Sequence, residues 1–269
     1  MDMKTRKRHI NLRFVVTFVA FTLMSTQGLA QQGAPVNGEW PTYGGDLGGT
    51  KYSPLTQINR DNFDDLKIAW RWQSADAFLS IDTPDGGEWW ANSQLIFDEL
   101  LRRDPNLWRD GQSPYLTNLK ATPLMVGGRL FINMPTSQTA SIDARTGKTL
   151  WVYNPKTYEK GTTTMTARWN QRGVAYWSGD PERTDERIFF GTGNGFLICV
   201  DAKNGRPCQD FGEAGWLDLL TDLPRASRGD RDWLNALRYS VQSPPLVIGN
   251  TVVTPSSISS YNITKEAPP

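Results

Sequence analysis

Residues 121–133, ATPLMVGGRLFIN, and residues 139–153, TASIDARTGKTLWVY, decide the fold expected for this chain. The first stretch has two short apolar runs on either side of Gly127-Gly128, which is typical of two antiparallel strands joined by a tight turn. In the second stretch a turn from Asp143 to Gly147 separates two further strands, and the last strand contains Trp151. Together the two stretches predict one unit of four antiparallel strands.

The same order of features recurs along the chain. Residues 173–177 (GVAYW), 187–192 (RIFFGT) and 196–206 (FLICVDAKNGR) repeat it, which predicts a second unit over Gly173–Arg206. Residues 243–253 (SPPLVIGNTVV) match the beginning of the first unit. An earlier run, Ile68–Trp72, resembles the tryptophan-containing last strand of a preceding unit.

Repeated four-stranded units describe the blades of a β-propeller, so the expected fold is all-β. Each blade buries its faces only against its neighbours, and a propeller is therefore stable when its ring closes. About three blades are too few to close a ring. We therefore expect residues 31–269 to form the N-terminal part of a truncated propeller domain.

The N-terminus has the pattern of a secretory signal peptide. Basic residues up to Arg13 precede an apolar run over Phe14–Met24, and small residues follow at Gly28 and Ala30. The alternative, a membrane anchor, requires about 20 consecutive apolar residues, and this run is much shorter. We expect residues 1–30 to be a signal peptide, with cleavage before Gln31 and a periplasmic mature protein.

Composition excludes several kinds of site. The sole histidine, His9, lies in the expected signal peptide, so the mature chain has no Ser-His-Asp triad, Cys-His pair or histidine-rich zinc site. A net charge of +1 gives no reason to expect nucleic acid as a partner. Any chemistry must come from carboxylates, lysines or a bound cofactor.

Two cysteines remain, Cys199 and Cys208. An oxidising compartment permits a disulfide between them. Cys199 stands in the apolar run 196–200, where a small buried core residue is the more ordinary interpretation. We therefore favour two free cysteines.

Several motifs together resemble the PQQ-dependent (pyrroloquinoline quinone) dehydrogenases. They are residues 40–46 (WPTYGGD), 51–59 (KYSPLTQIN), 143–151 (DARTGKTLW) and 172–177 (RGVAYW). Residues 197–219 are most similar to the glucose-dehydrogenase-type branch. Thr166-Ala167 stand where alcohol-dehydrogenase members carry adjacent cysteines, which agrees with that branch.

The resemblance implies an eight-bladed propeller that holds PQQ near its axis, beside a divalent cation such as calcium or a lanthanide ion. Such enzymes oxidise a sugar, polyol or alcohol and pass electrons to a cytochrome or a membrane quinone. Their catalytic carboxylate and main metal ligands normally lie in later blades, so the catalytic residues are expected beyond Pro269 and the fragment itself is expected to be inactive. No metal ligand is assigned in this chain, since Ser260 stands where the methanol type has a metal-binding glutamate.

The resemblance also implies cofactor contacts. Arg172 matches the family arginine that reaches the quinone, and a guanidinium suits a ligand with three carboxylates. Lys120, where relatives often have glutamate, is placed to pair with a PQQ carboxylate. For each, the alternative is an exposed residue at a turn or strand start. Further polar contacts are expected from four residues that also favour turns: Gln242, Ser243, Ser257 and Ser259.

Two other functions remain open. A non-catalytic periplasmic propeller would act as a scaffold for protein-protein interaction, and it would have no need of Arg172 or of the motif at residues 40–59. A hydrolase using only carboxylates would need a paired acid and base, and no pair of acids in the sequence is marked for that role.

Overall fold

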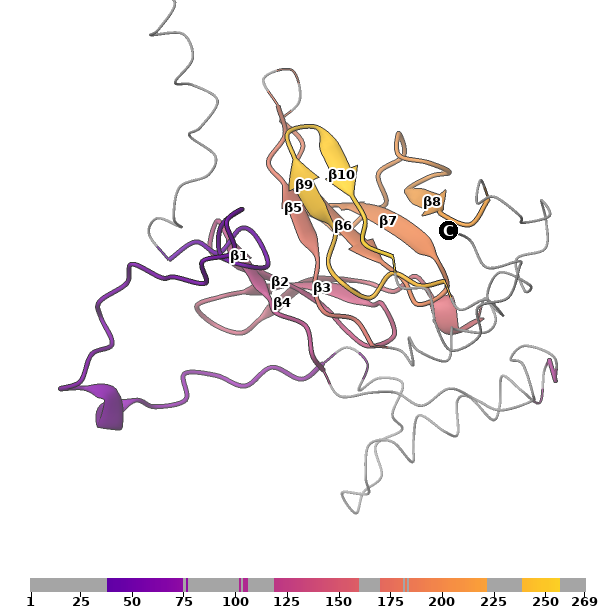
Figure 1. Ribbon diagram of the computed structural model, residues 1–269. Helices are drawn as coiled ribbons and strands as arrows, with labels where there is room; N and C mark the ends of the chain where they lie inside the picture. The colour runs from indigo at the N-terminus through magenta and orange to yellow at the C-terminus, as the bar shows by residue number, and fades with distance from the viewer. Residues whose placement is uncertain are drawn as a thin grey trace, which may run out of the picture.

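The computed structural model describes residues 38–74, 76, 102, 104–105, 119–159, 170–180, 182, 184–221 and 239–256. Within these residues the fold is all-β, as expected, with two four-stranded antiparallel sheets and one two-stranded hairpin (Figure 1). The residues that the structure describes include no helix long and apolar enough to cross a membrane. Two short 3-10 helices are η1 (Phe63–Asp65) and η4 (Thr157–Glu159).

The first sheet confirms the unit predicted at residues 121–153. Neighbouring strands pair in chain order, and Leu124 lies opposite Phe131 in the first pair. The glycine pair 127–128 makes the first turn with positive φ at both residues, a conformation that glycine adopts without steric cost. The strands are β1 (Leu124–Val126), β2 (Arg129–Asn133), β3 (Thr139–Asp143) and β4 (Thr149–Tyr153).

The second sheet has the same order but ends later than predicted. Its strands are β5 (Ala175–Trp177), β6 (Arg187–Gly191), β7 (Phe196–Asp201) and β8 (Trp216–Asp218). The predicted end at Arg206 is wrong, because Pro207 has no N–H to donate and makes only an isolated bridge with Val200. The chain loops out after this bridge and returns to β7 as β8.

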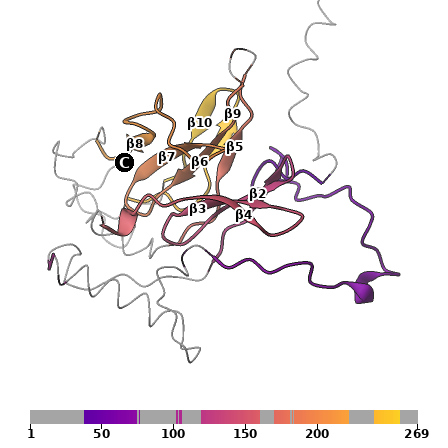
Figure 2. The ribbon, with the colours of Figure 1, turned by 180° about the vertical axis from the view of Figure 1, so that it is seen from behind.

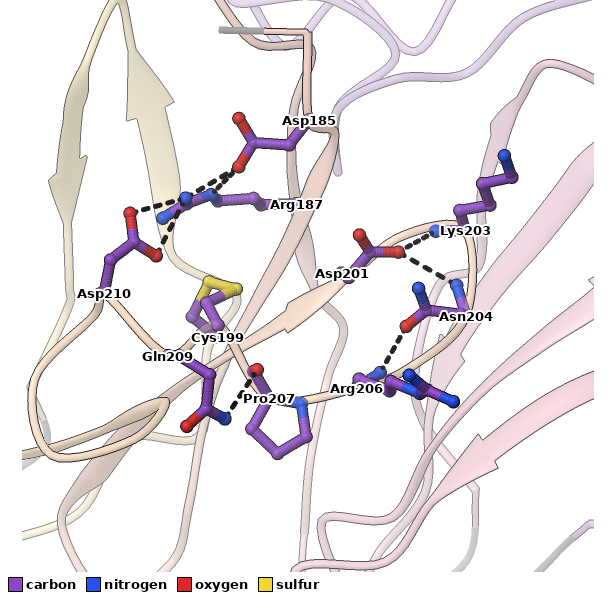
Figure 3. The surroundings of a disulfide bond; sticks show 11 residues. Asp185, Arg187, Cys199, Asp201, Lys203, Asn204, Arg206, Pro207, Gln209 and Asp210 are labelled. Carbon is purple, nitrogen blue, oxygen red and sulfur yellow. Dashed lines mark hydrogen bonds and ion pairs between the residues drawn. A yellow bond between two sulfur atoms is a disulfide. The ribbon is translucent and has the colours of Figure 1, made fainter.

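The expectation of two free cysteines is also wrong, because Cys199 and Cys208 form a disulfide (Figure 3). Cys199 is fully buried, as its apolar run predicted. The loop after Pro207 nevertheless brings Cys208 back beside β7, where its N–H donates to the Cys199 carbonyl oxygen at 3.1 Å. The Cα atoms lie 5.5 Å apart. The apolar pattern indicated burial but carried no information about which residue lies opposite.

The third unit begins with a hairpin of β9 (Leu246–Ile248) and β10 (Thr251–Val253), as the repeat predicted. The hairpin lies beside β5 in both views of the molecule (Figures 1 and 2). Val247 and Val252 pack against the apolar cluster that contains Phe189 and Cys199. The first strands of the second and third units are therefore neighbours.

The main core lies between the two four-stranded sheets. Leu124 and Phe131 of the first sheet pack together with second-sheet residues in one cluster. The partly buried Trp151 and Tyr153 pack against this cluster. Each sheet thus covers a face of the next, as neighbouring propeller blades do. The second sheet and the residues beside it contribute Val174, Ile188, Phe190, Ile198, Val200 and Ala202.

A tryptophan of the preceding unit contacts the turn between β3 and β4 of the first unit. Trp70 donates from Nε1 to the Ala144 carbonyl oxygen at 3.1 Å, and its ring lies against Gly147. The run Ile68–Trp72 was predicted to be a strand, and no strand is assigned to it. Its tryptophan nevertheless makes the contact expected of a preceding unit.

Candidate cofactor site

The segments that precede β1, β5 and β9 lie side by side. The Thr122 N–H donates to the Arg172 carbonyl oxygen at 2.9 Å, and the Arg172 N–H donates to the Gln242 carbonyl oxygen at 3.0 Å. These two main-chain bonds, which we call the backbone ladder, join three units at one edge. The structure therefore brings together segments that carry three of the predicted cofactor contacts, namely Lys120, Arg172 and Gln242.

The close approach of these segments depends on Gly173. A Cβ atom at this position would lie 3.3 Å from the Thr122 carbonyl oxygen and 3.6 Å from a Pro244 side-chain carbon. The first of these distances is tighter than ordinary van der Waals contact. Glycine at residue 173 therefore lets the first and third units approach the second.

The predicted side chains differ in exposure. Lys120 and Arg172 are exposed, while Gln242 and Ser243 are half-buried. Gln242 Nε2 also lies 3.5 Å from the hydroxyl of the buried Ser240, to which it donates. Ser257 and Ser259 lie outside the described residues, as does Ser260. Two cationic groups thus stand on adjoining segments of the site.

The donor set suits an anionic ligand. Lysine and arginine supply charge-assisted hydrogen bonds, and the glutamine amide and serine hydroxyl supply neutral ones. PQQ carries three carboxylates, so these residues fit its acidic groups. Within the described ranges no group of three or more His, Cys, Asp or Glu residues is arranged to hold a metal ion. The ammonium, guanidinium, amide and hydroxyl groups of the four residues are suited to binding and orienting a ligand. None of the four side chains carries a carboxylate that could act as a base.

A buried glutamine behind the ladder was missed by the sequence prediction. Gln171 is 2% exposed. With its amide oriented to satisfy both ends, Nε2 donates to the Val241 carbonyl oxygen at 3.3 Å and Oε1 accepts from the Gly193 N–H at 3.2 Å. Gln171 therefore ties the residues next to Arg172 and Gln242 to the turn between β6 and β7. A polar residue between an asparagine and an arginine gave no signal of burial.

A buried aspartate was missed as well. The Asp76 carboxylate accepts hydrogen bonds from the Thr136 hydroxyl, from the Thr136 N–H at 3.2 Å and from Gln138 Nε2 at 2.8 Å. Burial raises the pKa of this carboxyl above its ordinary value of 3.8, although the bonds from Thr136 and Gln138 act in the opposite direction. A single acid outside any periodic pattern cannot be recognised as buried from the sequence.

A cavity of about 310 Å³ lies beside the disulfide (Figure 3). Arg187 lines it and donates from Nε to Asp185 at 2.7 Å and from Nη2 to both carboxylate oxygens of Asp210 at 2.9 and 2.8 Å. Two carboxylates therefore neutralise this guanidinium. None of the candidate cofactor contacts lines the cavity, and we assign no ligand to it.

Comparisons with known proteins agree with the fold. Quinoprotein glucose dehydrogenase A of Acinetobacter calcoaceticus is 30% identical over 246 residues, which cover 85% of this chain and 25% of that protein. The dehydrogenase subunit of alcohol dehydrogenase (quinone) from Gluconacetobacter polyoxogenes is 32% identical over 173 residues, covering 63% of this chain and 17% of that protein. The chain thus spans about a quarter of the length of relatives that match most of it.

Among solved structures, the quinohemoprotein alcohol dehydrogenase of Comamonas testosteroni has a TM-score of 0.54 and 22% identity, over 90% of this chain and 27% of that one. At that identity the likeness supports the propeller fold alone. The model of the family described as PQQ, "Glucose/ethanol/alcohol dehydrogenase, beta-propeller domain", matches residues 40–269. The chain therefore belongs to the family of PQQ-dependent glucose, ethanol and alcohol dehydrogenase β-propellers.

Proposed function

We propose that this chain is the cofactor-binding part of a PQQ-dependent dehydrogenase that oxidises the CH–OH group of a sugar, polyol or alcohol. The observation that carries the proposal is the backbone ladder, which gathers Lys120, Arg172 and Gln242 at one edge in a chain of this family. The relatives are glucose and alcohol dehydrogenases. The chain spans only about a quarter of the length of these relatives, so an activity like theirs is a proposal for the whole protein.

The proposed roles follow from charge and position. Arg172 and Lys120 bind carboxylates of PQQ, and Gln242 and Ser243 donate neutral hydrogen bonds, with Ser257 and Ser259 as further contacts. PQQ, when bound, supplies the quinone that accepts the hydride. A divalent cation such as calcium accompanies it. Its ligands and the catalytic carboxylate are proposed to come from residues outside this chain, so the chain alone should be inactive.

The proposal extends to location and electron transfer. Residues 1–30 are proposed to be a signal peptide and residues 31–269 the propeller part of a periplasmic enzyme. The Cys199–Cys208 disulfide supports this location, since disulfides persist in oxidising compartments. A cytochrome or a membrane quinone is the proposed electron acceptor. Some relatives are named as quinone-linked dehydrogenases, which supports the second choice. N-terminal sequencing of periplasmic protein should begin near Gln31, and material that still begins at Met1 would refute the signal peptide.

The test of the cofactor site is PQQ binding by the protein expressed from its complete gene. Arg172→Ala removes a charge-assisted contact and should weaken PQQ affinity by about 1.5 to 3 kcal/mol, or roughly one to two decades in Kd. Arg145→Ala is the matched control, because Arg145 is an exposed arginine in the β3–β4 turn. Equal affinity in the two variants would reject Arg172 as a contact.

The test of the reaction is a dye-linked dehydrogenase assay after PQQ reconstitution, with glucose, polyols and short alcohols. The complete protein should turn over at least one of these substrates. PQQ-dependent turnover by residues 31–269 alone would contradict the proposal that the base and metal ligands lie elsewhere. Absence of PQQ binding in the complete protein would favour the scaffold function instead.

A further inference from the structure

A chain of buried hydrogen bonds begins at Asp76 and passes through the turn between β2 and β3. Thr136 and Gln138 of that turn donate to the Asp76 carboxylate, and both are almost fully buried. The Thr136 carbonyl oxygen in turn accepts a bond from the hydroxyl of Thr157 at 3.0 Å. The acid therefore holds a turn of the first unit, and this turn holds the segment that follows β4.

The chain continues into the second unit. The Thr157 carbonyl oxygen accepts a bond from Asn194 Nδ2 at 3.4 Å, and Asn194 Oδ1 accepts one from the Thr192 hydroxyl at 2.8 Å. Thr157, Asn194 and Thr192 are all completely buried. The turn between β6 and β7 is thus linked through side chains to the turn between β2 and β3.

The chain reaches the third unit at the candidate cofactor site. The Val241 N–H donates to the Thr192 carbonyl oxygen at 3.2 Å, and Gln171 bridges Gly193 and Val241. Val241 and Gln171 directly precede Gln242 and Arg172 in the sequence. The last links of the chain therefore hold the residues from which the proposed cofactor contacts project.

Buried hydrogen bonds fix the relative placement of the units more specifically than apolar contacts do. Apolar contact between two sheets favours burial but tolerates sliding, whereas a buried hydrogen bond is costly to leave unmade and specifies one arrangement. The buried chain crosses the boundaries between successive units at the end of the sheets where the backbone ladder lies. It therefore sets how the turns of these units stand relative to one another.

We propose that Asp76 is a positioning residue of the cofactor site, which acts through this chain of buried hydrogen bonds on the segments that carry Arg172 and Gln242. The inference rests on the proposed function for the identity of the ligand. The coupling between Asp76 and the ladder is a property of the protein without ligand, so it is tested separately. Asp76 touches neither cofactor nor substrate in this role.

The experiment uses the complete protein with two variants that break the chain at different links. Asp76→Asn keeps the shape of the side chain and replaces one acceptor by a donor, and Thr157→Val removes the hydroxyl with little change in volume. The control is Ile142→Ala, a truncation in the apolar core of the first sheet that lies outside the chain. Urea unfolding measures the free energy of unfolding of each variant. An effect of general destabilisation can then be separated from an effect on the segments that carry Arg172 and Gln242.

The first readout is hydrogen exchange without PQQ. Both chain variants should raise exchange at the Arg172 and Val241 amides by about tenfold or more relative to the control, since those amides close the ladder and the last link. The second readout is the Kd for PQQ, which should rise at least about fivefold in both chain variants and stay within about twofold of wild type in the control. If Asp76→Asn does not fold, Thr157→Val carries both measurements.

Two outcomes would overturn the positioning role of Asp76, and a third would reject the proposed cofactor site. Exchange at Arg172 and Val241 that matches the control in the folded chain variants would overturn the positioning role. Faster exchange with unchanged PQQ affinity would also overturn it, because the displaced segments would then not matter for the ligand. Loss of the Arg172→Ala effect on PQQ binding, with the exchange result intact, would instead reject the proposed cofactor site.

Discussion

Trp151 of β4 lies with its indole ring against Gly205 in the turn that follows β7, where an added Cβ would stand 2.6 Å from a ring carbon. The same indole donates from Nε1 to the Ala202 carbonyl oxygen at 3.0 Å. Trp70 makes the corresponding contact one unit earlier, against Gly147 and Ala144. The spacing between units is therefore fixed by an aromatic ring that fits only over glycine.

Gly205→Ala should destabilise the protein strongly. Gly205 has a φ of 72°, so alanine brings about 1 to 2 kcal/mol of left-handed backbone strain, and the clash with Trp151 adds about 1 to 3 kcal/mol. Gly128→Ala is the control, since its φ is 74° and no atom lies within 4 Å of an added Cβ. Urea unfolding should give a clearly larger loss for Gly205→Ala. Equal losses would show that the ring does not restrict this position.

Reduction of the disulfide should loosen the outer part of the second sheet. Cys199 and Cys208 close a short loop, for which chain entropy predicts a stabilisation of about 2 to 3 kcal/mol. Thermal unfolding with and without a phosphine reductant measures the effect. In the double variant Cys199→Ala with Cys208→Ala, the reductant should change nothing. Two titratable thiols in the native, unreduced protein would contradict the pairing.

Asp143 should titrate below its ordinary pKa of 3.8. The Thr146 hydroxyl and N–H donate to its Oδ1, both at 2.8 Å, and these bonds lower the pKa of the carboxyl. The stability that this group contributes is therefore complete above about pH 4 and is lost as pH falls through its folded-state pKa. Thr146→Val should raise the pKa toward 3.8 while the N–H bond remains. NMR titration of the side-chain carboxyl measures the shift, and an unchanged pKa in Thr146→Val would contradict this cause.

Gly191→Ala should displace the segment that carries Gln242 and so weaken PQQ binding. An added Cβ would stand 2.1 Å from a Val241 methyl carbon, so Val241 and the adjoining Gln242 must move. PQQ affinity should fall by at least about fivefold, or about 1 kcal/mol. Gly128→Ala is again the control, because no atom lies within 4 Å of an added Cβ there. The Val241 Cβ and carbonyl oxygen would also lie within 3.0 Å of the added atom, so trimming the Val241 side chain would not relieve the clash. A PQQ affinity equal to that of the control would show that the displaced segment does not matter for the ligand.

The repeated units could be predicted because their signals are local. Two glycines at 127–128 and the turn from Asp143 to Gly147 mark the hairpins within a few residues of the apolar runs they join. The same signals at Gly249 identified the hairpin of β9 and β10. Hydrophobic periodicity and turn residues act over short distances along the chain, so one sequence is enough to read them.

The features that were missed depend on partners far away in the sequence. Pro207 interrupts the outer pairing of β7, and the sequence alone does not show that the chain returns at Trp216 after a disulfide to Cys199. Asp76 is buried by a turn sixty residues later, which no local pattern reveals. Arg172, Lys120 and Gln242 were predicted as cofactor contacts through a resemblance to the family, and that prediction stays a prediction. The backbone ladder that joins their segments appeared only in three dimensions.

In the backbone ladder, main-chain atoms hold the segments of the site together, while the side chains on those segments remain available for contacts with a ligand. Main-chain atoms of Thr122, Arg172 and Gln242 make the bonds, so exchanging a side chain on one segment leaves the other two in place. Lys120 precedes Thr122 by two residues and takes no part in these bonds, so a change of its charge would leave the ladder in place. Ligand preference in such a site can therefore change one position at a time, during evolution or by engineering, without rebuilding the scaffold.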